Sequence, residues 1–131
     1  MRYLGIDYGE KHIGLALGDG ETKLSMPFKT IERIDDAKLI DSLRLIITQE
    51  GVDAIVVGIP HSPEKFQEQK KKNLVFARLL TQAIPSCSIV TADESFTSLE
   101  AGKRIKESGN KISSDHAVAA MLILQGHLDT L

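Results

Sequence analysis

The chain has little of several features that would place it in particular protein classes. It contains one cysteine, Cys87, among 131 residues, so it can form neither an internal disulfide nor a four-cysteine zinc site. Such sparse cysteine usage is typical of a reducing compartment, and we expect a cytoplasmic protein. The longest apolar run, residues 117–124, is far shorter than the ~20 residues of a membrane-spanning helix. We therefore expect no membrane partner.

Charge and aromatic content limit how the chain could hold a nucleic acid. Sixteen Lys and Arg face 18 Asp and Glu, for a net charge of -2, which argues against binding by bulk charge alone. Aromatic residues make up 5% and tryptophan is absent, which argues against extensive base stacking. A local group of basic side chains could still bind a phosphate backbone. The ordinary alternative is that these side chains only form a solvated helix face. The candidates are Lys11, Lys70, Lys71, Lys72, Lys103, Arg104 and Lys111.

The first third of the sequence predicts three strands. Residues 3–7 form a short, mostly apolar run that ends in a carboxylate and a turn. Residues 12–17 alternate between larger and smaller apolar side chains, and they are close enough to the first strand to form a hairpin. Residues 23–31 predict a third strand, at a sheet edge because Pro27 cannot donate a ladder hydrogen bond.

The rest of the chain alternates helices and strands. Apolar residues with helical periodicity begin at Leu39. Asp35 or Asp36 can cap the start of this helix, and Gly51 ends it. A continuous apolar run at 54–57 predicts a strand buried on both faces, as in a parallel sheet. The remaining predictions are a mobile polar loop at 61–73, a helix with Val75, Phe76, Leu79, Leu80 and Ala83 on one side, a strand at 87–91, and helices at 98–107 and 114–128.

This order predicts an α/β fold built on a five-stranded mixed sheet. Three antiparallel strands come first, parallel strands follow, and helices cover the faces. We find no internal repeat and no domain boundary, so we expect a single domain over residues 1–131.

Carboxylates lie at three junctions between an apolar element and a loop. Asp7 ends the first strand, Asp93 and Glu94 follow the fifth, and Asp115 opens the last helix. Ligands of open α/β sheets gather beyond the carboxyl ends of the parallel strands. Strands one, four and five should be parallel, so Asp7 and the Asp93–Glu94 pair should share one edge. A last helix packed across the sheet could bring Asp115 over that edge.

Such a cluster favours a bound cation, because two carboxylates at ~4 Å repel by roughly 4 kcal/mol at an effective dielectric constant near 20. Oxygen ligands without His or Cys favour Mg²⁺ or Mn²⁺. Two such ions could activate a water and stabilise the leaving oxygen of a phosphodiester. Taken singly, each residue has a simpler interpretation: Asp115 as a helix cap, Asp7 as a turn residue, and the Asp93–Glu94 pair as a solvated loop.

Four motifs together resemble the YqgF/RuvX family. The segments are 4–9 (Leu-Gly-Ile-Asp-Tyr-Gly) with 13–16 (Ile-Gly-Leu-Ala), 55–60 (Ile-Val-Val-Gly-Ile-Pro), 93–98 (Asp-Glu-Ser-Phe-Thr-Ser) with Ala101, and 115–120 (Asp-His-Ala-Val-Ala-Ala) with 122–125. The resemblance runs from about residue 3 to 128 in the family's order and spacing.

The resemblance implies a ribonuclease H-like fold and a metal-dependent nuclease that matures the 5′ end of small-subunit (pre-16S) ribosomal RNA. A Holliday-junction resolvase acting on branched DNA is the alternative, and a nucleic-acid-binding module with weak or lost catalysis is another. Carried over by position, Asp7, Glu94 and Asp115 are the catalytic, metal-binding carboxylates, with Asp93 beside them. The expected cofactor is Mg²⁺ or Mn²⁺, and the chain could act as a monomer or a homodimer.

Two positions depart from the family pattern. The acidic motif normally continues with an arginine, where this chain has Ser95. Loss of a guanidinium would remove a bidentate clamp on phosphate or carboxylate. The loop after Pro60 usually carries an Asp-Gly pair, and residues 61–72 contain none. Both departures affect substrate choice and rate more than metal binding.

Overall fold

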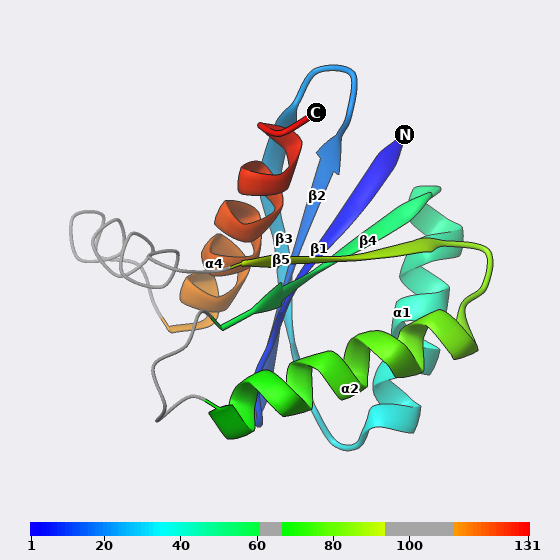
Figure 1. The fold of residues 1–131 in the computed structure, drawn as a ribbon, viewed down its shortest axis with the longest axis vertical. Coiled ribbons are helices and arrows are strands. Elements are labelled where there is room, and N and C mark those ends of the chain that lie inside the picture. Colours follow the sequence, from blue (N-terminus) through cyan, green and yellow to red (C-terminus); the bar gives the residue numbers. More distant parts are fainter. Residues whose placement is uncertain (61–66, 94–111) are drawn as a thin grey trace.

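The strands and helices alternate as the sequence predicts (Figure 1). The computed structural model describes residues 1–60, 67–93 and 112–131, with the backbone alone for 112–115. The elements are β1 (Arg2–Tyr8), β2 (His12–Asp19), β3 (Leu24–Glu32), α1 (Asp36–Glu50), β4 (Ala54–Ile59), α2 (Gln67–Ala83), β5 (Ser88–Asp93) and α4 (Ile112–Leu128). The helix predicted at 98–107 lies outside the described residues. In the part that is described, every helix is too short or too polar to cross a membrane.

The five strands form one mixed sheet in the order β3-β2-β1-β4-β5. β1 and β2 pair antiparallel, as do β2 and β3, whereas β1, β4 and β5 run parallel. The predicted fold class is therefore confirmed. β3 is an edge strand, and the ladder shifts register where Ala16 pairs with Pro27. Every residue of β4 is buried, as expected for a parallel strand covered on both faces.

Strand alternation divides the core between the two faces of the sheet. Even-numbered residues of β1, such as Leu4 and Ile6, pack with α1 and α2 in the larger cluster. Tyr3 on the same strand belongs to the smaller cluster, which α4 covers through Leu124 and Leu128. Figure 1 shows α4 beside β1–β3 and away from α1 and α2. The side chain of each strand residue can therefore be assigned to a face by its position.

Helix α4 lies unusually close to β1 and β2 because glycines face it. A Cβ added at Gly5 would lie 2.8 Å from the Cβ of Leu124 and 2.9 Å from the carbonyl oxygen of Ala120. A Cβ added at Gly14 would overlap the carbonyl oxygen of His116. The helix therefore runs over Gly5 and Gly14, with its N-terminal end at the carboxyl end of β1.

The ends of α1 follow the predicted capping chemistry. The Asp35 side chain accepts a hydrogen bond from the Lys38 backbone N–H at 2.8 Å. Asp35 rather than Asp36 is therefore the N-cap. Gly51 ends the helix in the left-handed conformation, with φ 65°, and its N–H bonds back to the Ile47 carbonyl. Glycine is the usual residue at this position because it has no Cβ to clash.

Helix α2 differs from the prediction in its start and in its buried face. It begins at Gln67, so the second half of the expected mobile loop at 61–73 is helical. Residues 61–66 lie outside the described part. Val75 was expected in the core but is 63% exposed, whereas Asn73 is 1% exposed. Asn73 is buried because its amide donates to the carbonyl oxygen of Gly58 at 2.7 Å.

Candidate active site

The carboxyl ends of β1, β4 and β5 meet at one edge of the sheet, as predicted. β1 ends at Tyr8 and β4 at Ile59, and Ile59 pairs with Asp93, the last residue of β5. Neighbouring strands lie about 4.8 Å apart, so side chains from these strand ends come within about 10 Å of one another. This edge is the place where the topology can gather ligands.

Asp7 projects from this edge on the α4 face of the sheet. It pairs with Gly14 of β2, and paired residues of antiparallel strands share a face. Because the backbone at Gly14 touches α4, Asp7 is on the side that α4 covers. Its side chain is half-buried, so water is partly excluded from the carboxylate.

The start of α4 approaches Asp7 through the contact between Gly14 and His116. The carbonyl group of His116 lies directly against the Cα of Gly14, the cross-strand neighbour of Asp7. Asp115 precedes His116 in the same helix. The backbone that carries Asp115 is thus held beside the strand pair that carries Asp7, although the two residues are 108 positions apart in the sequence.

Asp93 occupies a different position from the one expected. It is the last residue of β5 rather than a loop residue, and its partner Ile59 belongs to the core beneath α1 and α2. Asp93 is therefore on the face opposite Asp7. It lines a pocket of about 320 Å³ there together with Lys70. The following residue, Glu94, lies outside the described range.

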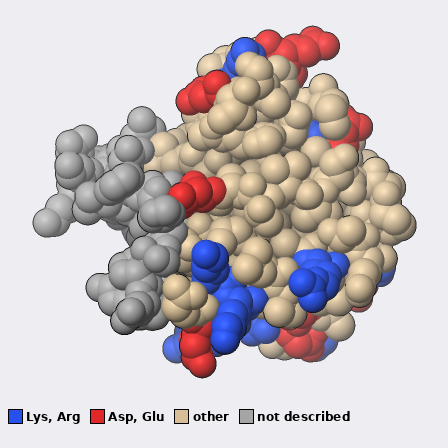
Figure 2. All heavy atoms as spheres, in the orientation of Figure 1, with Lys and Arg blue, Asp and Glu red and all other residues tan. Residues whose placement is uncertain are grey.

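The remaining predicted residues divide into two groups. Lys103, Arg104 and Lys111 lie outside the described residues, as does Ser95. Lys11, Lys71 and Lys72 are exposed and line a second pocket on the α1–α2 face. Figure 2 shows Lys and Arg side chains gathered over the first half of α2.

The fit of a divalent cation can be judged at Asp7 and α4. Among the side chains that are described, no three His, Cys, Asp or Glu side chains come together. That set does not include the side chains of Glu94 and Asp115. What the structure supplies is a half-buried carboxylate, Asp7, at the edge where the Asp115 backbone arrives. The carboxylates that the resemblance implies, Asp7 with Glu94 and Asp115, would suit Mg²⁺ or Mn²⁺.

Two histidines from distant parts of the sequence lie together on the face of the sheet that carries Asp7. The rings of His12 and His116 stack with centroids 5.1 Å apart and an interplanar angle of 10°. His12 begins β2 and is two positions from Gly14, so the pair flanks the point where α4 reaches the sheet. The residues are 104 positions apart, and spacing alone could not have found the contact.

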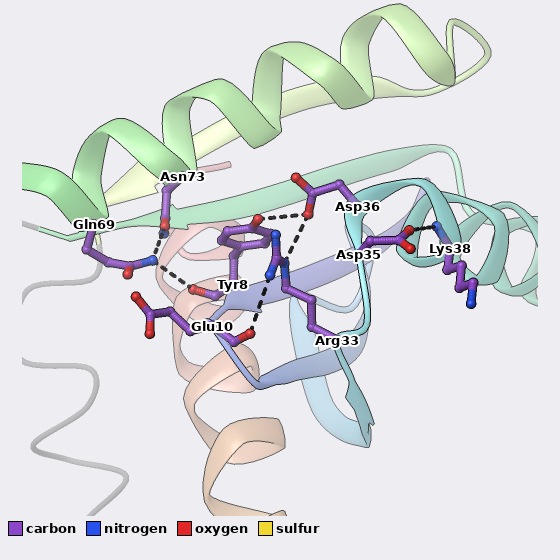
Figure 3. Close-up of polar contacts among 8 residues, drawn as sticks. All are labelled: Tyr8, Glu10, Arg33, Asp35, Asp36, Lys38, Gln69 and Asn73. Atoms are coloured by element: carbon purple, nitrogen blue, oxygen red, sulfur yellow. Dashed lines mark hydrogen bonds and ion pairs between the residues drawn. The ribbon is translucent and has the colours of Figure 1, made fainter.

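On the opposite face, Tyr8 anchors a polar network (Figure 3). Its hydroxyl donates to Oδ1 of Asp36 at 2.8 Å, and Nε of Arg33 donates to the same oxygen at 3.1 Å. Burial, and then the hydrogen bond to Asp36, raises the pKa of the Tyr8 hydroxyl, because both disfavour the charged phenolate. The phenol therefore stays protonated at neutral pH and holds the start of α1 against the end of β1.

Two more contacts complete the network around the end of β1. Gln69 donates from Nε2 to the Tyr8 carbonyl oxygen at 3.3 Å and to Oδ1 of Asn73 at 2.7 Å. Lys72 Nζ lies 3.0 Å from Oε1 of Glu10. This hydrogen bond, more than the general attraction of the charge, lowers the pKa of the Glu10 carboxyl. The first turns of α2 are thus tied to β1 and to the β1–β2 turn.

Comparison with known sequences gives matches over nearly the whole chain. A family model described as "RuvX: Holliday junction resolvase" matches residues 1–130. A protein of Dehalococcoides mccartyi is 36% identical over 124 residues, which cover 92% of each chain. One from Dictyoglomus turgidum is 32% identical over 136 aligned positions, covering 100% of this chain and 96% of the other. Both carry the name "Putative pre-16S rRNA nuclease".

Comparison with solved structures identifies the same fold. T. thermophilus RuvC in complex with a Holliday junction substrate superposes with a TM-score of 0.63 at 14% identity, covering 99% of this chain and 95% of that one. The Fowlpox virus resolvase in complex with Holliday junction DNA gives 0.63 at 11% identity, with 99% and 98% covered. At such low identities the likeness establishes the architecture, which is the ribonuclease H-like fold that the resemblance implied.

Proposed function

This chain belongs to the RuvX family of Holliday junction resolvases, and from that premise we propose that it is a metal-dependent nuclease that hydrolyses phosphodiester bonds. The substrate we propose is the precursor of small-subunit ribosomal RNA, cleaved near its 5′ end. The names of the full-length relatives support this choice. The observation that carries the proposal is the close contact of Gly14 with His116, which brings the start of α4 to Asp7.

The proposed ligands are Asp7, Glu94 and Asp115, with Mg²⁺ or Mn²⁺ as the cation. When bound, the divalent ions would activate a water molecule and stabilise the leaving oxygen. Asp7 would hold the cation from β1, and Glu94 and Asp115 would supply further carboxylate oxygens, Asp115 for the ion that activates the water. Asp7 is half-buried, so its carboxylate is partly shielded from solvent. We leave Asp93 out of the proposed set, because its pairing with Ile59 places it on the α2 face of the sheet.

Four-way DNA junctions are the second candidate substrate. The description of the matching family and the architecture shared with RuvC and the Fowlpox resolvase favour this possibility. A cleavage assay that offers precursor RNA and a four-way junction to the same enzyme, in Mg²⁺ and in Mn²⁺, decides between the two. Binding without cleavage in either metal, unchanged by EDTA, would instead indicate a binding module that has lost catalysis.

The Asp7→Asn variant tests the site. We expect cleavage to fall by at least about 10²-fold, because the amide removes the charge that binds the cations. Mn²⁺ should raise the melting temperature of the wild-type protein by ligand linkage and should raise that of Asp7→Asn much less. Asp41→Asn is the matched control, since Asp41 lies on α1 with a side chain 74% exposed. Wild-type cleavage by Asp7→Asn would show that the site assignment is wrong.

A further inference from the structure

A second pocket lies at the same sheet edge as Asp7, on the opposite face. It has a volume of about 590 Å³, which is within the range of small-molecule sites. It opens between the β1–β2 turn, the start of α1 and the first turns of α2. Four of its side chains are cationic and two are carboxylates, so the pocket carries a net positive charge. Its lining residues are Tyr8, Glu10, Lys11, Arg33, Asp36, Lys71, Lys72 and Val75.

The carboxylates of this pocket are already paired within the protein. Asp36 accepts hydrogen bonds from Arg33 and from the Tyr8 hydroxyl. Glu10 is bonded to Lys72 at 3.0 Å. Lys11 and Lys71 are exposed and form no ion pair with the described residues. The two ammonium groups that remain are therefore available to an anion from outside.

The aromatic ring of Tyr8 is not available for stacking by a nucleobase. Phe76 stacks on it with centroids 4.2 Å apart. The guanidinium of Arg33 lies over it, with Cζ 5.6 Å from the ring centroid. Phe76 and Arg33 cover the faces of the ring, and the hydroxyl is hydrogen-bonded to Asp36. A ligand in this pocket therefore contacts charged side chains rather than an exposed aromatic face. Recognition in this pocket should therefore depend on an anionic group and not on base identity.

The backbone holds this arrangement in place before any ligand arrives. The Arg33 N–H donates to the Lys11 carbonyl oxygen at 2.9 Å, which fixes the β1–β2 turn against the end of β3. At Gly9 a Cβ would lie 2.6 Å from the carbonyl oxygen of His12, so the turn is too tight for a side chain. A fixed turn lowers the entropy that Lys11 must lose when it binds an anion.

We propose that this pocket binds a phosphate group, supplied by the backbone of a nucleic-acid strand or by a free mononucleotide. Lys11 and Lys71 bind its oxygens from the β1–β2 turn and from α2. A strand held there would cross the same sheet edge that carries Asp7, gripped on one face and exposed to the carboxylates on the other. The idea that a nucleic-acid strand supplies the phosphate rests on the proposed nuclease function. The phosphate site itself does not depend on that function.

The test compares three matched variants, Lys11→Gln, Lys71→Gln and Lys38→Gln. Lys38 is an exposed lysine of α1 that does not line the pocket. Binding of labelled precursor RNA and of a four-way DNA junction is measured by anisotropy in EDTA, where no cleavage can occur. Binding of adenosine 5′-monophosphate is measured by calorimetry, with adenosine as the ligand that lacks phosphate.

We expect Lys11→Gln and Lys71→Gln each to weaken binding by about fivefold to tenfold in roughly 0.1 M salt. For the nucleic acids, each variant should also make the slope of log K against log[salt] shallower by about 0.7–0.9. Lys38→Gln should change affinity less than about twofold. If the two pocket variants lose affinity for nucleic acid alone, a strand is the source of the phosphate. If they lose affinity for the mononucleotide alone, a free nucleotide is the source. Unchanged affinity for both ligands, or an equal loss in Lys38→Gln, would overturn the proposal. Cleavage by Asp7→Asn would refute the nuclease site without affecting these binding results.

Discussion

Replacing Gly14 by alanine should separate the docked helix from the sheet at the candidate site. The added methyl group would occupy the space of the His116 carbonyl oxygen. That oxygen belongs to the backbone of α4, so it cannot rotate away as a side chain could. We expect the start of α4 to be displaced, and with it Asp115.

The size of the effect follows from two opposing contributions. Alanine in a strand is favoured over glycine by roughly 0.5–1 kcal/mol, because glycine loses more backbone entropy on folding. Overpacking a well-packed contact costs about 1–3 kcal/mol, and a rigid backbone partner places Gly14 near the upper end. The free energy of unfolding should therefore fall by about 2 kcal/mol. At roughly 4 °C per kcal/mol, the melting temperature should fall by about 8 °C.

Two other glycines provide graded controls for this measurement. Gly126, on α4 itself, has nothing within 4 Å of an added Cβ. Gly126→Ala should therefore stabilise the helix by up to about 1 kcal/mol. Gly5→Ala meets Leu124 at 2.8 Å and should have an intermediate effect. Urea unfolding gives the order of stability, and cleavage under saturating Mn²⁺ should follow the same order. A Gly14→Ala protein as stable and as active as wild type would refute the docking argument.

Three further perturbations test the rest of the structure. Tyr8→Phe removes the hydrogen bond from the Tyr8 hydroxyl to the Asp36 carboxylate. It should therefore lower the free energy of unfolding at pH 7 by about 1–2 kcal/mol. Because the pKa of Tyr8 is raised, this contribution is complete below about pH 10 and is lost as the pH rises through the folded-state pKa. Urea titrations should show the gap between wild type and variant closing above that pH. Asn73→Ala removes the side-chain donor to the buried carbonyl oxygen of Gly58. It should lower the free energy of unfolding in the same assay by about 1–3 kcal/mol. Burial raises the pKa of the Cys87 thiol, so a thiol reagent at pH 8 should label the native protein far more slowly than the urea-unfolded one; equal rates would contradict its burial.

Much of the architecture could be predicted because local chemistry and the fold agree. The apolar run of β4, the edge position of Pro27 and the cap at Gly51 each follow from rules that act over a few residues. The contribution of Asn73 could not be predicted in this way. Its amide is buried only because β4 presents the carbonyl of Gly58 to it, and that partner is 15 residues away.

The candidate site shows the same division between local and distant information. The positions of Asp7 at a strand end and of Asp115 in the last helix could be predicted from the sequence. The side of the sheet on which Asp93 lies depends on the register that pairs it with Ile59, and a one-residue slip of that register would move its side chain to the other face. The stacking of His12 on His116 depends on the path of α4 across the sheet, which no local pattern encodes.

The order of synthesis gives the docking of α4 a further consequence. The strands of the sheet precede α4 in the chain, so a ribosome completes β1–β5 before it translates Asp115. Any reaction that requires acids from both β1 and α4 cannot begin on a partly made chain. If Asp7 and Asp115 act together as proposed, a nascent polypeptide would carry Asp7 while surrounded by ribosomal RNA, yet it would be inert until the helix had left the exit tunnel and packed over Gly5 and Gly14.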